Sequence, residues 1–542
     1  MRDYATACSS FSINRLEGEV LSGSFAGGLN ACVECCDRWA ADGRLALDWM
    51  GQDGSRQRVT FAEFQARAAR FANVLAVRDI GRGDVVAGMV PRVPDLITVI
   101  LGCWRIGAVY QSLFTAFGPA AVQTRIAGPG SSDAKLVVVD ATNRPKLDEV
   151  ADCPPVLVLS RGQPLRAGDS DFDTDMAASP TEFAPVMVRG DDPFGIIFTS
   201  GTTGRAKGVV YPLKALLQFA VFMRDGVDLR DADVYWCLAD PGWALGMIGT
   251  ITAPLLLGHA TVLYEGPFSV ASTVDVVNTL GVTNLVAAPT VFRMMRAAGE
   301  AAVAPIHGKL RAVSSGGEPL NPELNRWAAA ALGRPIHEVY GQTEMGVNVL
   351  NHHGIRHEAR AGSVGLPSPG MALAVIDDDL NEVASGTTGV LAVDRSRSPL
   401  FFFMGYWQAE TPSFLGKWYL TGDSMYRDAD GYLYFVARND DIITSAGYRI
   451  GPSEVESILI EHPSIAEVAV IGKPDPERTE IVKAFVVLRG GHNGSPELAE
   501  ELRLLVHRRL SAHAYPRELE FLDALPKTMS GKVQRFVLRQ RG

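Results

Sequence analysis

A stretch rich in glycine and hydroxyl residues, FTSGTTGRAKGVV at 198–210, is the clearest chemical feature of the sequence. Backbone N–H groups, short hydroxyl side chains and Lys207 are typical of a loop that holds a phosphate. The Walker A pattern GxxxxGK[ST] does not fit, because Gly204 follows Gly201 by three residues and Gly208 follows the lysine. The GxGxxG dinucleotide pattern does not fit either. A plain surface loop is the alternative, but the apolar run FGIIF before it predicts a buried strand that anchors the loop.

Five further motifs follow along the chain. They are SSGGEPLNPE (314–323), VYGQTEMG (339–346), YLTGD (419–423), ARNDDIITSAGYRIGPSEVE (437–456) and PKTMSGKVQR (526–535). Together with Thr199–Gly208 they resemble, in the same order, the motifs of the adenylate-forming superfamily. This superfamily contains acyl-CoA synthetases, aryl-CoA ligases, luciferases and peptide-synthetase adenylation domains. One departure is Ala206, which replaces the usual proline and removes no phosphate donor.

The resemblance implies a site for ATP and Mg²⁺. The loop would grip the β- and γ-phosphates, Tyr340 would stack on adenine, and Asp423 would bind the ribose hydroxyls, to which two acceptor oxygens are suited. Thr343 and Glu344 match the pair that contacts the α-phosphate and holds Mg²⁺. The full set implied to bind ATP is Thr199, Ser200, Gly201, Thr202, Thr203, Gly204, Lys207, Gly317, Glu318, Pro319, Glu338, Tyr340, Gly341, Gln342, Thr343, Asp423 and Arg438.

The resemblance also assigns catalytic and moving parts. Lys532, with Thr343 and Glu344, would be catalytic, because a cation between the attacking carboxylate and the α-phosphate offsets their repulsion. Asp440 matches the hinge about which a small C-terminal domain rotates, so that Lys532 serves the first step and another face serves the second. The residues implied to contact CoA are Ala446, Gly447, Tyr448, Arg449 and Arg478.

The expected reaction is ATP-dependent joining of a carboxylic acid to CoA, through acyl-AMP and with release of pyrophosphate. The C-terminal half is most similar to medium-chain acyl-CoA synthetases. Acetate-specific relatives close the acyl pocket with a tryptophan where this chain has Gly341, and a second bulky neighbour is replaced by Gly316. Since each buried methylene contributes about 0.8 kcal/mol, we expect short-to-medium-chain, branched or cyclic acids. The residues expected to line the acyl pocket are Trp243, Ala244, Leu245, Gly316 and Gly341.

Other functions stay open at this point. An acetyl- or propionyl-CoA synthetase, or a stand-alone adenylation enzyme that loads a separate carrier protein, would share the same motifs. CoA is favoured as acceptor because the chain ends ten residues after Lys532, without a fused carrier domain. A Walker-type NTPase or kinase is disfavoured by the missing Ser or Thr after Lys207. A non-catalytic binder is disfavoured by the presence of Lys532, Glu344 and Asp423.

The elements that must position these residues follow a β–α alternation. Apolar runs at 84–90, 135–140, 155–160, 261–266, 284–289 and 311–317 predict strands, with helical patterns between several of them, as in LITVILGCWRIGAVY (96–110). This predicts an α/β fold, a large N-terminal domain (1–438) of helix-covered sheets followed by a small mobile α+β C-terminal domain (439–542). Ser453 and Glu456 predict a capping box for a helix near 454. Residues 161–190 predict a polar surface excursion, and 425–436 a hairpin.

Composition limits the remaining possibilities. The chain has 542 residues and a formal net charge of −10, which disfavours nucleic-acid binding. Seven scattered cysteines indicate a reducing cytoplasm, and CVECC (32–36) is interpreted as part of an amphipathic helix over 29–43 in preference to a zinc site. The longest apolar stretch, 246–264, contains Pro254 and His259 and predicts an interior region instead of a membrane span. We expect a cytoplasmic monomer or homodimer.

Overall fold

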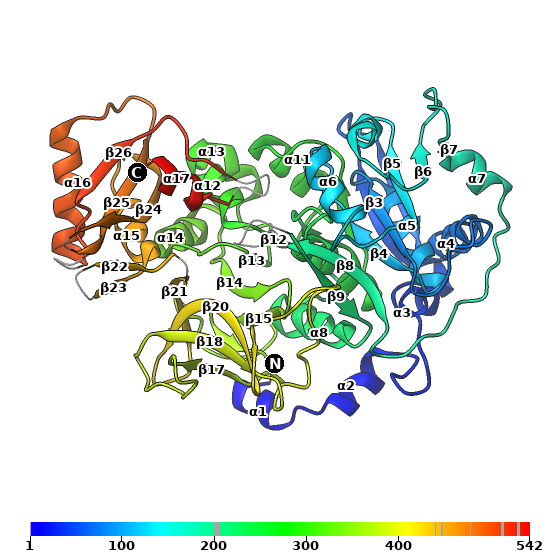
Figure 1. Cartoon of the computed structure of the whole chain (residues 1–542), viewed down its shortest axis with the longest axis horizontal. Helices are drawn as coiled ribbons and strands as arrows, with labels where there is room; N and C mark the ends of the chain where they lie inside the picture. The colour runs from blue at the N-terminus through cyan, green and yellow to red at the C-terminus, as the bar shows by residue number, and fades with distance from the viewer. Residues whose placement is uncertain are drawn as a thin grey trace.

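The computed structural model describes residues 2–199, 206–439, 441–445, 448–476, 478–510, 514–527 and 532–541. It is a mixed α/β protein with a large N-terminal part and a smaller C-terminal unit. Figure 1 shows the C-terminal unit, coloured orange to red, at one end of the molecule and a largely blue and cyan sheet at the other. None of the described helices is long and apolar enough to cross a membrane.

A seven-stranded sheet carries the glycine-rich loop. Its strand order is β7-β6-β5-β3-β4-β8-β9, and neighbouring strands are parallel except for the antiparallel pair β8 and β9. The strands are β3 (Val85–Met89), β4 (Val109–Ser112), β5 (Leu136–Asp140), β6 (Val156–Leu159), β7 (Ser170–Asp171), β8 (Pro193–Thr199) and β9 (Lys207–Pro212). The associated helices are α4 (Phe61–Ala76), α5 (Pro94–Arg105), α6 (Pro119–Ile126) and α7 (Phe172–Ala178). All residues of α5 except Asp95 are buried, which explains its apolar sequence.

A nine-stranded sheet carries two more motifs. Its order is β16-β15-β14-β13-β12-β10-β11-β1-β2, parallel from β14 to β1 and antiparallel at both edges. The strands are β1 (Leu45–Met50), β2 (Arg56–Thr60), β10 (Tyr235–Cys237), β11 (Thr261–Tyr264), β12 (Asn284–Ala287), β13 (Ala312–Gly316), β14 (His337–Gln342), β15 (Gly346–Leu350) and β16 (Leu366–Pro367). Helices α11 (Val270–Leu280), α12 (Pro289–Ala298), α13 (Glu300–Val303) and α14 (Pro322–Ala331) lie between its strands in sequence.

The apolar stretch at 246–264 lies inside the protein, as predicted. It runs through α9 (Ala244–Gly246), a π-helical segment (Met247–Thr252), α10 (Ala253–Leu256) and β11. A similar pairing of α8 (Ala215–Val221) with a π-helical segment (Phe222–Gly226) precedes it. These helices join the main hydrophobic core.

A third, antiparallel sheet was not predicted. It consists of β17 (Leu373–Ile376), β18 (Gly389–Asp394), β19 (Phe414–Leu415), β20 (Trp418–Arg427) and β21 (Leu433–Arg438). The predicted hairpin over 425–436 is confirmed as its β20–β21 turn. Figure 1 shows this sheet in yellow, near the N-terminal helices α1 (Tyr4–Ser9) and α2 (Ile13–Val20).

The C-terminal unit has an α+β arrangement. Its five-stranded sheet has the order β23-β22-β25-β24, with β26 added beside β25. The elements are β22 (Ile443–Ser445), β23 (Tyr448–Ile450), α15 (Pro452–Leu459), β24 (Ile465–Asp475), β25 (Thr479–Leu488), α16 (Pro496–Arg509), β26 (Glu518–Phe521) and α17 (Arg535–Arg541). It has its own cores, one on each face of the sheet.

Two local predictions were wrong. Helix α3 (Ala31–Cys35) ends at Cys36, whose φ of −141° breaks the helix before a 3₁₀ turn, and Asp37 then pairs with Arg105 at 2.8 Å. Helix α15 has Gly451 as its N-cap and no capping box, because Glu456 instead binds elsewhere in the unit. The polar excursion predicted over 161–190 is mostly exposed, as expected, and contains β7 and α7.

Candidate functional site

Asp423 is the centre of a hydrogen-bonded cluster between two sheets. Its Oδ2 accepts hydrogen bonds from the Tyr340 hydroxyl at 2.5 Å and from Gln342 Nε2 at 2.6 Å, both on β14. Arg438 Nη1 lies 3.2 Å from Oδ1, because β20 and β21 place these two residues opposite each other. Oδ1 nevertheless accepts no hydrogen bond from the described residues, so it has capacity for a ligand hydroxyl.

The C-terminal unit acts electrostatically on this cluster. Burial raises the pKa of Asp423, whereas Arg438, the two hydrogen bonds and the charge of Lys532 lower it. Lys532 is exposed and belongs to the C-terminal unit. The charge of Lys532, in the C-terminal unit, therefore acts on the buried carboxyl of Asp423 in the N-terminal part. The two parts also touch where Asn321 Nδ2 donates a hydrogen bond to the Ser457 carbonyl at 3.5 Å.

Thr343 and Glu344 occupy the turn between β14 and β15. The Tyr406 hydroxyl donates to Glu344 Oε1 at 2.8 Å. Burial raises the pKa of Glu344, while this hydrogen bond and the charge of Arg438 lower it. A single half-buried carboxylate fits Mg²⁺, which binds through one or two carboxylates and substrate phosphates.

The glycine-rich loop connects β8 and β9. Thr199 pairs with Lys207 across this hairpin, and its Oγ1 donates to the Lys207 carbonyl at 3.4 Å. Lys207 Nζ lies 4.9 Å from the centre of the Tyr406 ring, so loop and Glu344 meet at one tyrosine. Of the predicted loop residues, five lie outside the described residues: Ser200, Gly201, Thr202, Thr203 and Gly204.

The motif SSGGEPLNPE, which contains three residues implied to bind ATP, covers the end of β13 and the residues that follow it. Gly317 has a φ of +94°, which favours glycine. The Glu318 carboxylate is held by Thr290, at 3.0 Å, and by Arg293, both on α12. Its side chain is therefore held against α12. Pro319 is exposed.

Glu338 is the most perturbed carboxyl of the predicted set. It lies on β14, is 6% exposed, and accepts a hydrogen bond from Leu320 N at 3.0 Å. Burial raises its pKa to about 8.

The predicted acyl-pocket residues do not all have the expected geometry. Trp243 packs against Phe114 and Phe117, with ring centres 5.4 and 5.5 Å away, and Ala244 and Leu245 follow it, half-buried, in α9. A Cβ on Gly341 would lie 2.1 Å from the Gly346 carbonyl oxygen, and a Cβ on Gly316 would lie 2.7 Å from the Val339 carbonyl oxygen. The interpretation of these two glycines as empty side-chain space is therefore corrected: each allows close approach of neighbouring backbone.

The predicted CoA and hinge residues are described only in part. Asp440, Ala446 and Gly447 lie outside the described residues, as do the side chains of Tyr448 and Arg449, whose backbone forms β23. Arg478 is half-buried between β24 and β25, and its N–H donates to Asp475 Oδ1 at 2.8 Å.

Sequence reasoning missed two tyrosines of the site. Tyr406 holds Glu344, and the Tyr419 hydroxyl donates to Gln342 Oε1 at 3.0 Å. Tyr406 is 62 positions from Glu344, and Tyr419 is 77 positions from Gln342. No spacing in the sequence links them.

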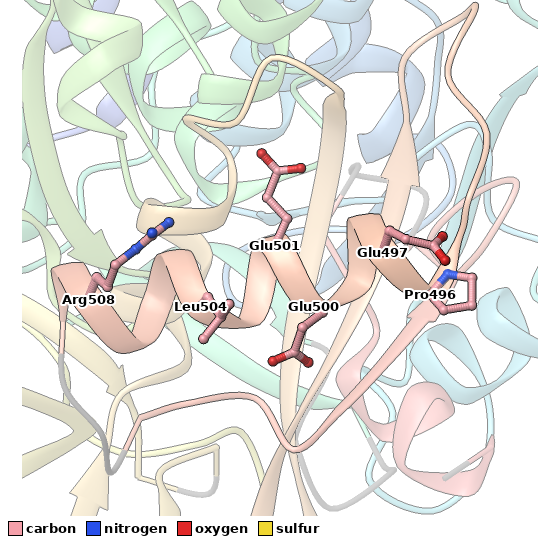
Figure 2. Close-up of a pocket in the computed structure, with 6 residues that line it drawn as sticks. All are labelled: Pro496, Glu497, Glu500, Glu501, Leu504 and Arg508. Atoms are coloured by element: carbon pink, nitrogen blue, oxygen red, sulfur yellow. The ribbon is translucent and has the colours of Figure 1, made fainter.

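Two surface hollows are lined by none of the residues of this cluster. One of about 660 Å³ lies on the outer side of α16, where Figure 2 shows its side chains spread along the helix. It is lined by Pro496, Glu497, Glu500, Glu501, Leu504 and Arg508. The described residues also contain no group of three or more His, Cys, Asp or Glu side chains able to hold a metal ion, at CVECC or elsewhere.

Comparison with known proteins gives consistent similarities. Residues 34–407 match the family described as AMP-binding enzyme, and residues 454–532 match the AMP-binding enzyme C-terminal domain. The chain is 39% identical to the acetyl-coenzyme A synthetase of Bacillus subtilis (strain 168), over 95% of this chain and 90% of the relative.

Two solved structures extend the comparison. The Brucella canis acyl-CoA synthetase is 50% identical, with a TM-score of 0.82 over 100% of this chain and 99% of the other. ATP-bound MatB from Rhodopseudomonas palustris is 26% identical, with a TM-score of 0.83 over 95% and 99%.

Proposed function

We propose that this chain, which belongs to the AMP-binding enzyme family and is an AMP-forming acid–CoA ligase that uses ATP and CoA, acts on an acid longer than acetate. The proposed substrates are short-to-medium-chain, branched or cyclic carboxylic acids. In the first half-reaction a carboxylate oxygen attacks the α-phosphorus and pyrophosphate leaves. In the second, the CoA sulfur attacks the acyl carbon, the thiol proton is lost and AMP leaves.

One observation carries the assignment of the site: the convergence on Asp423 of residues from three motifs. Tyr340 and Gln342 reach its Oδ2, Arg438 reaches its Oδ1, and the charge of Lys532 is felt there. We propose that the free capacity of Oδ1 receives a ribose hydroxyl. Two acceptor oxygens suit a vicinal diol.

The reacting groups are proposed to lie between Lys532 and Glu344. Lys532 offsets the repulsion between the acid carboxylate and the α-phosphate as they approach. Glu344 is the residue proposed to hold Mg²⁺, which supplies neutralising charge when bound with ATP. Thr343 precedes Glu344 in the same turn and is proposed to contact the α-phosphate.

The domain boundary is proposed at 438/439, with Asp440 as the hinge. Two observations support it. Strand β21 ends at Arg438, and Asp441 is bound by arginines of α17 in the C-terminal unit. The residues 446–449 and Arg478 are proposed to serve CoA after rotation. The seven cysteines are all free thiols, which supports a proposed reducing, cytoplasmic compartment.

The proposal on acid length is supported by similarity to two solved CoA ligases whose names specify acids larger than acetate, an anthranilate CoA ligase at 26% identity and a benzoate CoA ligase at 25% identity. A specific observation favours acetate as the second candidate: several curated relatives at 32–39% identity are named acetyl-coenzyme A synthetase. The two candidates differ in how kcat/KM changes with chain length.

A panel of acids tests the proposal. Acid-dependent pyrophosphate exchange is measured with acetate, propionate, butyrate, hexanoate, isobutyrate and cyclohexanecarboxylate, and the thioester with CoA is identified by mass. We expect kcat/KM to rise beyond acetate, by up to about fourfold per well-packed methylene. A sharp maximum at acetate would reject the longer acid. Exchange without thioester formation from CoA would point to a carrier protein as acceptor.

A further inference from the structure

We propose that Arg535 is a positioning residue for Lys532 and acts by tying the lysine-bearing segment to the part of the chain that follows residue 440. This inference rests on the proposed adenylation role of Lys532. In this scheme an ion-pair cluster in the C-terminal unit contributes to acyl-AMP formation and not to thioester formation.

The segment that carries Lys532 is closed at its base. Lys527 and Val533 form an antiparallel bridge, and Gln534 N donates to the Pro526 carbonyl at 2.8 Å. Lys532 therefore lies immediately before the point where the two ends of the segment meet. Helix α17 begins three positions after Lys532, at Arg535.

Arg535 joins three other parts of the unit. Its Nη2 lies 2.6 and 2.9 Å from the two carboxylate oxygens of Glu456 on α15. Its Nε donates to the Val470 carbonyl of β24 at 3.2 Å, and its Nη1 lies 3.5 Å from Asp441 Oδ2. One turn further along α17, Arg539 Nη2 donates to Asp441 Oδ1 at 2.6 Å.

This cluster is largely removed from water. The side chains of Arg535, Glu456 and Asp441 are 23%, 18% and 14% exposed. Removing one partner from such a cluster leaves an uncompensated charge, and a flexible ammonium does not reproduce the fixed fork of a guanidinium. Arg535 therefore fixes the start of α17 relative to α15, β24 and Asp441.

The position of Lys532 depends on that fixed start. Arg535 is three positions after Lys532, so a shift of α17 is passed directly to the lysine. A misplacement of about 1 Å at a reacting centre costs about a hundredfold in rate. The second half-reaction does not use Lys532 in the proposed scheme, so it should not feel the shift.

The test compares Arg535→Gln with Arg509→Gln. Arg509 makes an ion pair with Glu461 on another side of the unit and serves as the matched control. For Arg535→Gln we expect acid-dependent pyrophosphate exchange to fall by about a hundredfold with an unchanged KM for ATP. Conversion of supplied acyl-AMP and CoA to thioester should stay within about twofold of wild type. Arg509→Gln should leave both rates unchanged.

Two more variants keep the inference open to refutation. Glu456→Gln should reproduce the selective loss, and Arg535→Lys should restore only part of the exchange. Equal loss of both half-reactions in Arg535→Gln and Glu456→Gln, with lowered Tm, would overturn the inference in favour of a structural role. Wild-type exchange in both variants would overturn it as well. If Lys532→Ala itself keeps full exchange, the proposed role of Lys532 fails, which is a separate result.

Discussion

At the residue scale, the hydroxyl of Tyr406 connects two parts of the proposed nucleotide site. It donates to Glu344 Oε1 at 2.8 Å, and the Tyr406 ring lies beneath the ammonium of Lys207. A carboxyl group must be ionised to hold a metal ion. The hydrogen bond is the largest of the influences that lower the pKa of Glu344 against burial.

Tyr406→Phe should shift the acidic side of the pH–rate profile toward higher pH. Loss of the hydrogen bond raises the pKa of Glu344 further, so a larger fraction is protonated at a given acidic pH. We expect kcat/KM to fall below neutral pH and the apparent KM for Mg²⁺ to rise, with smaller changes at pH 8.

The pH profile of Tyr434→Phe is the matched control, because this hydroxyl donates to Asp428, near the turn between β20 and β21, and not to Glu344. An identical profile for Tyr406→Phe and wild type would show that Tyr406 does not tune Glu344.

At the element scale, the turn between β14 and β15 determines what the motif VYGQTEMG can do. Antiparallel pairing of Gly341 with Val347 brings the two backbones together and leaves no room for a side chain at 341. The turn then presents Thr343 and Glu344. The motif VYGQTEMG therefore contains a residue required for strand packing, Gly341, beside the residues proposed to bind ligands.

Gly341→Ala should therefore destabilise the protein, because its Cβ would lie 2.1 Å from the Gly346 carbonyl oxygen. We expect a loss of about 1–3 kcal/mol in the free energy of unfolding, measured by urea denaturation. Gly490→Ala is the control, since no atom lies within 4 Å of its added Cβ. Equal stability of the two variants would contradict this account.

Four histidines join the N-terminal helix to β14 and the residues after β15. The rings of His337 and His353 stack at 3.7 Å, and His352 lies 5.6 Å from His357 and 6.0 Å from Tyr4. Burial lowers the pKa of His352 to about 3. Since this histidine stays neutral in the fold but is protonated in the unfolded chain below about pH 6.5, it makes stability fall as pH decreases.

His352→Phe should remove part of that pH dependence. One such histidine costs about 2 kcal/mol of folding stability between pH 7 and pH 5. Neither ring nitrogen makes a hydrogen bond of normal geometry to the described residues, so the apolar ring is expected to be tolerated. Unfolding free energies at both pH values measure the effect, with exposed His492→Phe as control. An unchanged difference between the two pH values would contradict it.

The strands that are buried on both faces were predictable, because continuous apolar runs such as LVVVD are typical of them. The third sheet as a whole was not, since its central pairing of β18 with β20 joins distant residues such as Gly389 and Met425. The cap of α15 was missed for a related reason: Glu456 binds Arg535, 79 positions away, and not its own helix start. In the site, motifs located Asp423 and Glu344, but Tyr406 and Tyr419 became visible only when the sheets were assembled.

At the scale of the whole molecule, the cation of the small unit and the buried carboxyl of the large part share one site. Lys532 lowers the pKa of Asp423 in the described arrangement. This arrangement is the one expected for acyl-AMP formation. The second half-reaction would need a different face of the C-terminal unit.

Lys532→Ala should separate the two half-reactions. We expect loss of acid-dependent pyrophosphate exchange, by about a thousandfold, because a charge-stabilising group has been removed from the first transition state. Conversion of supplied acyl-AMP and CoA to thioester should persist. Both rates are measured on the same preparation, and equal loss of both would refute the alternation of the C-terminal unit.

Glu338 gives the enzyme an acid–base property that its overall charge does not reveal. With a pKa of about 8 the buried carboxyl keeps its proton at neutral pH. The wall of the proposed nucleotide site is therefore uncharged at this position when a polyanion approaches. In mild alkali the same residue becomes a buried anion. Since Glu338 belongs to the proposed ATP site, we expect the affinity for ATP to fall as the pH rises through about 8.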